Sequence, residues 1–296
     1  MMEFLKKLFT PGPRVKTVDI SKRFSLEART GQGSMSKVWR ARDLNSGRIV
    51  AVKLLDAEKT KRFESRFQGM KVKKPTEGEI AVQLKHRHIV KTLEYGIATT
   101  GEPFLVMEFI EGASLSYYVS LQNDVMKENC LRFMIELGEA IEYFHKQNWI
   151  HRDICPRNVM VDQDLNVKLI DFGLVVPNTL QFQAPGNRTG TANYMAPELI
   201  KRQKTDQRLD IFSYAVTCYE MCAARLPWEA AETLEAVMQH INSPPDDLAR
   251  VVKGIDPQVA ETLMKGLAVS PDDRWRTMRE MLEPLREAEE RRVKKK

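Results

Sequence analysis

The most informative part of this chain reads His151-Arg152-Asp153-Ile154-Cys155-Pro156-Arg157-Asn158, followed thirteen residues later by Asp171-Phe172-Gly173. Asp153 is a carboxylate that can accept a proton, and carboxylates are common general bases. The Asn158 amide and the Asp171 carboxylate are oxygen ligands of the kind that hard metal ions prefer. The two segments therefore predict a site on two loops in which a base and a metal ion act together.

A glycine-rich turn lies upstream of these loops, between two predicted strands. It reads Gly31-Gln32-Gly33-Ser34-Met35-Ser36-Lys37-Val38, in which glycines and small residues let the backbone approach a phosphate closely. A Gly-x-Gly turn alone is weak evidence, because many such turns are plain hairpins. A strand follows it where a dinucleotide-binding turn would open a helix, so the pattern does not favour a Rossmann fold.

Lys53 lies in the apolar strand Ile49–Leu55, on the same strand face as Ala51 and Leu55. A lysine among apolar side chains needs an anionic partner, which can be a carboxylate or a phosphate. The strand therefore predicts a buried or half-buried lysine with a charged partner.

Glu77 and Glu79 are the candidate partners, and both open the next predicted helix. Two residues apart, they point about 200° away from each other around the helix. Glu77 shares the apolar face of this helix, whereas Thr76 and Glu79 match a capping box. We predict that Glu77 pairs with Lys53 and that Glu79 caps the helix.

The rest of the chain divides into a strand-rich part and a helical part. Strands are predicted at Phe24–Thr30, Val38–Ala41, Ile49–Leu54, Val90–Ile97 and Phe104–Ile110. After Gly112 the apolar residues recur at helical spacing, first at Cys130, Met134, Leu137, Ile141 and Phe144. Further helices are predicted at about 207–222, 232–242, 257–267 and 277–290.

Taken in order, these motifs resemble the serine/threonine-specific branch of the eukaryotic-type protein kinases, from about Phe24 to Pro284. Three more segments carry the resemblance: Thr189–Glu198 with Ala196-Pro197-Glu198, Asp210-Ile211-Phe212-Ser213, and Pro271-Asp272-Asp273-Arg274-Trp275. The resemblance implies an α+β, bilobal, protein-kinase-like fold. Its small lobe is a five-stranded antiparallel sheet with one helix, and its larger lobe is mainly helical.

The resemblance also implies domain boundaries. We expect an N-terminal arm at residues 1–20 and a kinase domain at 21–288, with a small lobe at about 21–110 and a large lobe at about 111–288. Residues 289–296 are expected to form a basic C-terminal tail.

The resemblance implies ATP and Mg²⁺ as cofactors and a role for each motif. Asp153 would act as the catalytic base, with Thr191 beside it. Asn158 and Asp171 would hold Mg²⁺. The nucleotide would be bound by Thr30, Gly31, Gln32, Gly33, Ser34, Ser36, Val38, Ala51, Lys53, Glu77, Met107, Glu108 and Ile110. Within that set Lys53 steers the phosphates, and the backbone at Glu108 and Ile110 holds adenine behind Met107.

Further parts of the pattern imply structural and regulatory roles. Glu198 and Arg274 would form an ion pair, and Asp210 would brace the loop around Asp153. Arg152 resembles the arginine that engages a phosphorylated activation segment, for which Thr189 is our preferred phosphorylation site.

Two positions depart from the family pattern. Ser36 stands where the third glycine of the glycine-rich turn is usual. Cys155 stands where a lysine usually helps to hold the transferred phosphate. Arg157 occupies a position at which the tyrosine-specific branch also carries arginine while lacking that lysine, so Arg157 is a candidate for the missing cation and for a catalytic residue.

The substrate implied by the resemblance is a protein with a serine or threonine acceptor. Kinases of the family that prefer basic peptides often have an acid at the position of Arg157 and another just after the hinge, where this chain has Ser114. We therefore expect a kinase that is not arginine-directed at the residues just before the acceptor. The open alternatives are a pseudokinase-like nucleotide-binding scaffold with little turnover, and a small-molecule phosphotransferase of related fold.

Composition excludes several other classes of function. The net charge is +6, but the last six residues carry +5 and residues 1–23 carry +4, which leaves −3 for residues 24–290. A slightly acidic body is not the footprint of a nucleic-acid-binding protein. The basic ends are expected to be solvated, with a weak contact to an acidic partner or anionic lipid as the alternative.

Localisation follows from what the sequence lacks. The sequence contains no run of about 18 apolar residues, so no transmembrane segment is predicted. No secretory signal is recognised at the start. The four cysteines have no metal-site spacing and are not expected to form disulfides. We expect a cytoplasmic protein.

Overall fold

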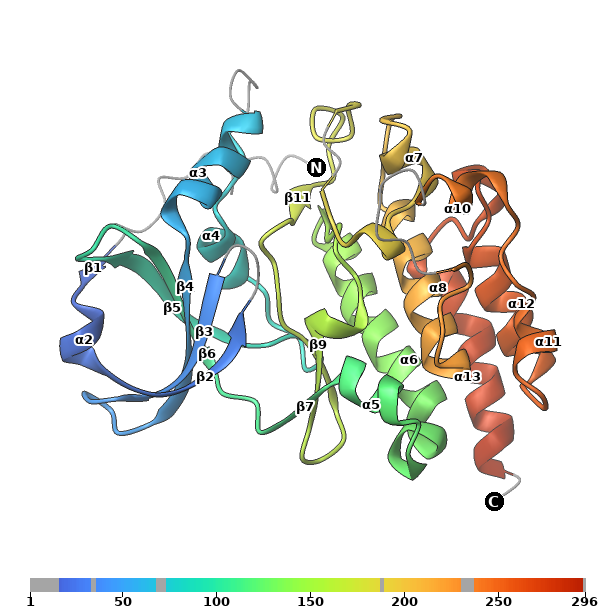
Figure 1. The fold of residues 1–296 in the computed structure, drawn as a ribbon, viewed down its shortest axis with the longest axis horizontal. Coiled ribbons are helices and arrows are strands. Elements are labelled where there is room, and N and C mark those ends of the chain that lie inside the picture. Colours follow the sequence, from blue (N-terminus) through green and yellow to red (C-terminus); the bar gives the residue numbers. More distant parts are fainter. Residues whose placement is uncertain (1–15, 33–35, 68–72, 187–188, 230–236, 295–296) are drawn as a thin grey trace. The chain divides into compact units, whose positions relative to one another are not determined.

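The computed structural model describes residues 16–32, 36–67, 73–186, 189–229 and 237–294 (Figure 1). The expectations for residues 1–15, for Gly33 and Ser34, and for the first half of the helix at 232–242 therefore lie outside the described residues. The chain forms two compact units, Met1–Glu111 and Gly112–Lys296.

The first unit is built on one twisted sheet. Its elements are β1 (Lys16–Val18), α2 (Ile20–Arg23), β2 (Phe24–Gln32), β3 (Ser36–Asp43), β4 (Ile49–Leu55), α3 (Ala57–Glu64), η1 (Ser65–Phe67), α4 (Glu77–Ala81), β5 (Thr92–Ala98) and β6 (Pro103–Glu108). The strand order is β1-β5-β6-β4-β3-β2. Strand β4 lies near the centre and alternate apolar residues fill the core on one face, among them Phe24, Ala41, Val50, Val52 and Phe104.

The α+β fold class is confirmed, but two details of the predicted small lobe are wrong. The sheet has a sixth strand, β1, which runs parallel to β5, so the sheet is not purely antiparallel. Gly96 permits this pairing, because a Cβ there would lie 2.6 Å from the Lys16 carbonyl oxygen. The second detail is the number of helices. One helix was predicted, whereas the described part of this unit contains α2 and α3 in addition to α4.

The second unit is mainly helical. Its elements are β7 (Gly112–Ser114), α5 (Leu115–Leu121), α6 (Asp124–Lys146), β8 (Trp149–Ile150), η2 (Pro156–Asn158), β9 (Val159–Asp162), β10 (Val167–Leu169), β11 (Val176–Pro177), η3 (Ala192–Tyr194), α7 (Pro197–Ile200), α8 (Arg208–Ala223), α10 (Gln239–Asn242), α11 (Leu248–Val251), α12 (Pro257–Gly266), η4 (Pro271–Asp273) and α13 (Met278–Lys294). Helix α8 is buried on all sides over Leu209–Tyr219 and forms the centre of this unit.

The C-terminal helix is longer than the sequence pattern predicts. Helix α13 packs along α6 and continues to Lys294, so the expected tail boundary at residue 288 lies inside a helix (Figure 1). Two of the tail's basic side chains are bound: Arg291 donates to Asp256, and Arg292 donates to Glu289 and to the Glu128 carbonyl. The charge of this segment is therefore partly neutralised within the fold.

Candidate active site

In the first unit, Lys53 and Glu77 form a buried ion pair. The Lys53 Nζ lies 2.6 Å from the Glu77 Oε1, and the side chains are 4% and 8% exposed. Lys53 lies in the middle of β4, opposite Val38 of β3 and Leu105 of β6. An unpaired charge in this position would destabilise the fold, so the buried Lys53 ammonium needs the Glu77 carboxylate as its partner. The predicted pairing is confirmed.

Helix α4 holds Glu77 through its first turn. The Glu79 amide donates to the Thr76 hydroxyl, and the Glu79 carboxylate accepts from the Thr76 amide at 2.7 Å. This reciprocal capping box is confirmed, and it fixes the start of the helix on which Glu77 is presented.

The other predicted nucleotide-binding residues of this unit lie on neighbouring strands. Ala51 of β4 lies opposite Met107 of β6, and both are buried. The backbones of Gly31 and Gln32 pair with those of Val38 and Lys37 where β2 ends and β3 begins, and Ser36 is the first residue of β3. The Thr30 hydroxyl is 3.5 Å from the Val38 carbonyl oxygen.

The segment after β6 is where adenine binding was expected. The Glu108 amide donates to the Lys91 carbonyl at 2.9 Å, and a Glu108 carboxylate oxygen accepts from the Lys91 amide. Glu108 is therefore anchored at the end of the sheet. Ile110 follows the strand as a half-buried residue of irregular backbone.

In the second unit, the Asp153 carboxylate is held on both oxygens. Its Oδ1 accepts from the Thr191 amide and the Thr191 hydroxyl, each at 2.8 Å. Its Oδ2 accepts from the Asn158 side-chain amide at 2.9 Å, and the same amide donates to the Asp153 carbonyl at 2.8 Å. These bonds fix the orientation of the carboxylate, and the predicted proximity of Thr191 and Asp153 is confirmed.

Asn158 and Asp171 are the expected metal ligands, and their chemistry fits Mg²⁺. The Asn158 nitrogen is directed at Asp153, which turns its oxygen away from that residue. The Asn158 carbonyl accepts from Ile170, next to Asp171, so the two loops are joined by a backbone bond of 3.0 Å. No three His, Cys, Asp or Glu side chains gather as a metal site among the described residues. A set of one amide and one carboxylate suits Mg²⁺, which keeps waters and phosphate oxygens as ligands.

Asp210 braces the loop that carries Asp153, as predicted. It lies in the first turn of α8, fully buried, and its two oxygens accept from the backbone amides of His151 and Arg152, each at 2.8 Å. The His145 Nε2 lies 3.0 Å from the Asp210 Oδ2, a contact that the sequence reasoning missed. Burial opposes ionisation, but hydrogen bonds from His145 and His151 hold the pKa of Asp210 below its usual value.

The backbone of this loop is unusual at Arg152, which has a φ of 71°. The Arg152 carbonyl approaches Gly190 of the facing segment, where φ is 141° and a Cβ would lie 2.9 Å from the carbonyl oxygen. A larger residue at position 190 would therefore separate Thr191 from Asp153. This explains why a glycine stands immediately before Thr191.

His151 has a structural role in this site. Its buried ring makes edge contacts with Phe144 and Phe172, at centroid distances of 5.2 Å and 6.1 Å. Burial lowers the pKa of His151, so the ring is neutral at pH 7 and packs as an aromatic side chain. The cluster fixes Phe172, which is the neighbour of Asp171.

Cys155 is buried beside Asp153, with 1% of its surface exposed. Its Sγ lies 3.8 Å from the Thr191 Oγ1, and burial raises the pKa of the thiol to about 12. The side chain is therefore neutral at pH 7 and supplies no charge. Arg157, two residues later, is exposed and interacts electrostatically with Cys155.

Arg157 also interacts with a pair that the sequence reasoning missed. The Tyr194 hydroxyl donates to the Glu220 carboxylate at 2.5 Å. Burial raises the pKa of Glu220, whereas the Tyr194 hydrogen bond and the charge of Arg157 lower it. The available signal was that Glu220 is the one acidic residue in the apolar segment 211–228.

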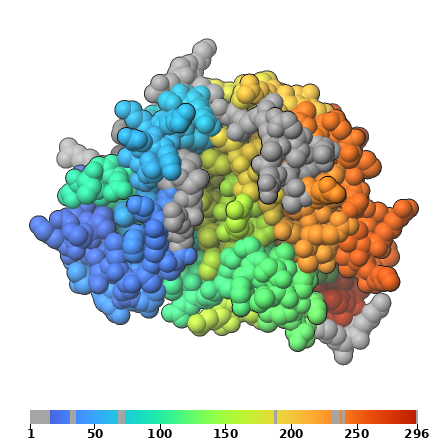
Figure 2. All heavy atoms as spheres, in the orientation of Figure 1, coloured from blue at the N-terminus to red at the C-terminus, as the bar shows by residue number. Residues whose placement is uncertain are grey.

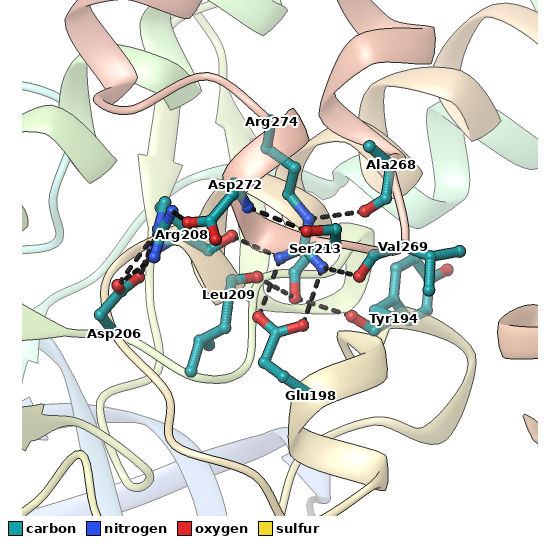
Figure 3. A network of polar contacts seen from close by, with 11 residues as sticks. Tyr194, Glu198, Asp206, Arg208, Leu209, Ser213, Ala268, Val269, Asp272 and Arg274 are labelled. Carbon is teal, nitrogen blue, oxygen red and sulfur yellow. Dashed lines mark hydrogen bonds and ion pairs between the residues drawn. The ribbon is translucent and has the colours of Figure 1, made fainter.

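Glu198 and Arg274 form the predicted ion pair, with two bonds of 2.8 Å and 2.7 Å (Figure 3). The Arg274 guanidinium also donates to the carbonyls of Ala268, Val269 and Arg208. Both charged side chains are buried, and Figure 3 shows them enclosed by α7, α8 and the loop before η4. The pair ties the end of the segment that carries Thr191 to the body of the unit.

Thr189, the preferred phosphorylation site, lies just before Gly190. Its hydroxyl oxygen is buried and forms no hydrogen bond within the described part of the chain. Modification of this hydroxyl therefore requires the segment to rearrange first.

Comparisons with known proteins agree with this arrangement. The protein kinase domain family matches residues 24–284. The chain is 30% identical to a probable serine/threonine-protein kinase of Streptomyces coelicolor over 267 residues, which cover 88% of this chain and 39% of that relative. It is also 30% identical to the serine/threonine-protein kinase PknB of Mycolicibacterium smegmatis over 274 residues, 88% of this chain and 42% of the relative.

The similarity extends to further bacterial proteins, such as the PknB of Mycobacterium tuberculosis, at 28% identity over 270 residues. The chain spans about two fifths of the length of these curated relatives. Within the described residues, no helix has the length and apolar character needed to cross a membrane.

Proposed function

The chain belongs to the protein kinase family, and from this premise we propose that it transfers the γ-phosphoryl group of ATP to serine or threonine hydroxyls of a protein. The observation that carries the proposal is the Asp153 carboxylate, which Thr191 and Asn158 hold on both oxygens. A carboxylate fixed in this way orients an acceptor hydroxyl and takes its proton during transfer.

Residues of the first unit are proposed to bind ATP. Lys53, oriented by Glu77, neutralises charge on the phosphates, and the backbone at Glu108 and Ile110 hydrogen-bonds adenine beside Ala51 and Met107. The glycine-rich turn, Thr30–Val38, covers the phosphates. Phosphoryl transfer depends on alignment and charge neutralisation more than on covalent chemistry, which is what these residues supply.

Asn158 and Asp171 are proposed to hold Mg²⁺, which would neutralise the phosphate oxygens when bound. The Asn158 nitrogen donates to Asp153, so the metal ligand and the base are positioned by the same side chain. Asn158 therefore couples the orientation of the acceptor hydroxyl to that of the metal.

The direct test is transfer of label from γ-labelled ATP to a generic protein substrate, followed by identification of the phosphorylated amino acid. We expect phosphoserine or phosphothreonine, loss of transfer on chelation of Mg²⁺, and a fall of about 10²-fold or more in Lys53→Met. Lys61→Met changes an exposed lysine of the same unit and should retain the rate. Nucleotide binding without transfer would instead indicate the scaffold function.

Arg157 is proposed to supply the cation that Cys155 lacks. Its guanidinium is exposed, interacts electrostatically with Cys155, and is attracted to Glu220. An arginine near the transferred phosphate stabilises the charge that develops there.

This proposal makes a specific prediction for a double-mutant cycle. Arg157→Ala should lower kcat by about 10²-fold, because one cation is lost. Cys155→Lys should change the unmutated protein little but restore much of the loss in Arg157→Ala. Equal gains from Cys155→Lys in both backgrounds would mean that Arg157 does not substitute for the lysine.

We also propose that the kinase is not arginine-directed at the residues before the acceptor. Arg157 is positive where basic-directed relatives carry an acid, and Ser114 caps α5 with its hydroxyl. Glu220 is already compensated by Tyr194 and Arg157. Basic peptides would therefore meet a positive side chain and a carboxylate that already accepts a hydrogen bond from Tyr194.

A positional peptide array checks this preference. We expect no enrichment of arginine at the positions before the acceptor for the unmutated protein. Arg157→Glu should increase that enrichment, because it removes a repulsive charge and frees Glu220. Strong arginine selection by the unmutated protein would contradict the proposal.

The remaining expectations concern the setting of the domain. We propose a catalytic domain at about 21–288 and a cytoplasmic location, supported by four cysteines that are free thiols. Contact of the basic ends with an acidic partner or anionic lipid is a weaker proposal, because Arg291 and Arg292 are engaged within the fold.

A further inference from the structure

Helix α4 begins with Glu77 and continues with Gly78, a residue type that helices disfavour. A glycine inside a helix costs about 1 kcal/mol relative to alanine. Gly78 has an ordinary helical backbone, so its conformation does not require a glycine. The side chain must be absent for another reason, which is the space available beside the helix.

Tyr95 of β5 occupies the space in which a side chain at position 78 would lie. A Cβ on Gly78 would be 2.6 Å from the Cγ and Cδ2 of Tyr95 and 2.7 Å from its Cβ. The Cβ of Tyr95 is fixed by the backbone of β5, so no change of rotamer removes the contact. Because α4 packs on β5, this contact limits how closely the helix approaches the sheet.

Lys53, Leu105 and Tyr95 form one row across the sheet. Leu105 of β6 lies opposite Tyr95 of β5 on one side and opposite Lys53 of β4 on the other. Side chains that lie directly opposite each other point to the same face of a sheet. Helix α4 contacts both ends of this row, because Glu77 binds Lys53 and Gly78 lies against Tyr95.

Helix α4 is an internal element of the first unit. Four of its five residues are buried, and Leu105 in the middle of the row is 1% exposed. Figure 2 shows α3, in light blue, at the surface, in agreement with its mainly exposed side chains. Because protein interiors are close-packed, extra volume at position 78 would have to be accommodated by a shift of α4 away from β5.

We propose that Gly78 and Tyr95 are positioning residues, whose contact sets the distance between the Glu77 carboxylate and the Lys53 ammonium. Tyr95 and Lys53 are two strands apart, roughly 10 Å, and α4 reaches from one to the other. A shift of α4 at Tyr95 therefore displaces Glu77 from Lys53. The catalytic consequence of this inference rests on the proposed function of Lys53, whereas the displacement of Glu77 can be measured without any activity.

Gly78→Ala is the first variant. The substitution raises helix propensity, so at an unhindered position it would stabilise the fold by about 1 kcal/mol. We expect instead that displacement of Glu77 exposes the Lys53 amine. The measurement is the rate at which acetic anhydride modifies Lys53 in the nucleotide-free full chain, followed by peptide mass spectrometry. This rate should be several-fold higher in the variant than in the unmutated protein.

Tyr95→Phe is the matched control, because it removes the hydroxyl but keeps the three atoms that a Cβ on Gly78 would meet. It should leave the modification rate of Lys53 unchanged. Tyr95→Gly removes all three atoms, so adding it to Gly78→Ala should return the rate to that of Tyr95→Gly alone. Amide hydrogen exchange in β4 and β6 checks that the sheet stays folded, which a positioning role requires.

Steady-state kinetics connect the contact to the proposed function. Gly78→Ala should lower kcat by about 10²-fold, the effect of misplacing a catalytic group by about 1 Å. Faster modification of Lys53 with an unchanged kcat would count against the role proposed for Lys53 and leave the positioning contact supported. An unchanged modification rate in Gly78→Ala, loss of protection throughout its sheet, or the same increase in Tyr95→Phe would overturn the proposal.

Discussion

Asp153→Asn is expected to lower kcat by about 10³-fold while leaving nucleotide affinity nearly unchanged. The substitution removes the proposed proton acceptor but keeps the size of the side chain. It also removes one of two hydrogen-bond acceptors. Both partners of the carboxylate are donors, Thr191 to Oδ1 and Asn158 to Oδ2. An amide can accept on one side only, so one of these contacts must be lost.

The measurement is the steady-state rate of phosphoryl transfer, with nucleotide affinity measured separately by titration. Asp164→Asn is the matched control, because Asp164 is an exposed carboxylate on the turn between β9 and β10. It should transfer phosphate at the unmutated rate. A rate for Asp153→Asn within a few-fold of that control would remove Asp153 from the mechanism.

Arg274→Met is expected to destabilise the second unit by about 3–5 kcal/mol, the usual cost of breaking a buried ion pair. The substitution leaves the Glu198 carboxylate, 3% exposed, without its cation. It also removes the donors to the carbonyls of Ala268, Val269 and Arg208, which lie in the same buried network (Figure 3). Unsatisfied buried acceptors add to the loss.

Urea unfolding followed by tryptophan fluorescence measures this effect, because Trp149, Trp228 and Trp275 all lie in the second unit. Arg279→Met is the matched control. Arg279 also pairs with a glutamate, Glu283, but at 3.6 Å and with 74% and 59% of the side chains exposed, so its loss should cost less than about 1 kcal/mol. Similar costs for the two variants would show that the buried network does not stabilise the unit.

Adding Glu198→Gln to Arg274→Met separates the cost of the unpaired buried charge from the cost of lost packing. The neutral amide removes the buried unpaired charge, so the double variant should be less destabilised than the sum of the single variants. Strict additivity would mean that the two side chains act independently.

The Lys53–Glu77 pair could be predicted from the sequence because both charged residues were expected to be buried. Each residue lies on an apolar face of its own element, and a buried charge requires an opposite one. The capping box at Thr76 and Glu79 was predictable because its residues are three positions apart, within one helical turn. The order of the loops around Asp153 and Asp171 likewise identifies the family, since each motif is a contiguous segment.

Contacts between segments far apart in the chain leave no pattern in the sequence, so they could not be predicted. Tyr194 and Glu220 are 26 residues apart, and their hydrogen bond exists because the segment after Thr191 folds back on α8. The short strand β1 is not predicted by its own three residues, because a parallel strand of this length is stabilised by the edge of β5. The end of α13 is helical because it packs on α6, although its composition resembles a solvated tail.

The sequence by itself determined the fold class and the order of the motifs, and it singled out the residues proposed as the base, the metal ligands and the phosphate-binding lysine. The strands and helices follow from local periodicity, and the charged partner of Lys53 follows from the cost of burying a charge. The roles of Asp153, Asn158 and Asp171 are implied by the resemblance of their segments to the protein kinase family. The tertiary structure decided how the Asp153 carboxylate is oriented and that Tyr194 hydrogen-bonds Glu220. Those contacts arise from the packing of segments far apart in the chain, where spacing along the sequence carries no information about distance.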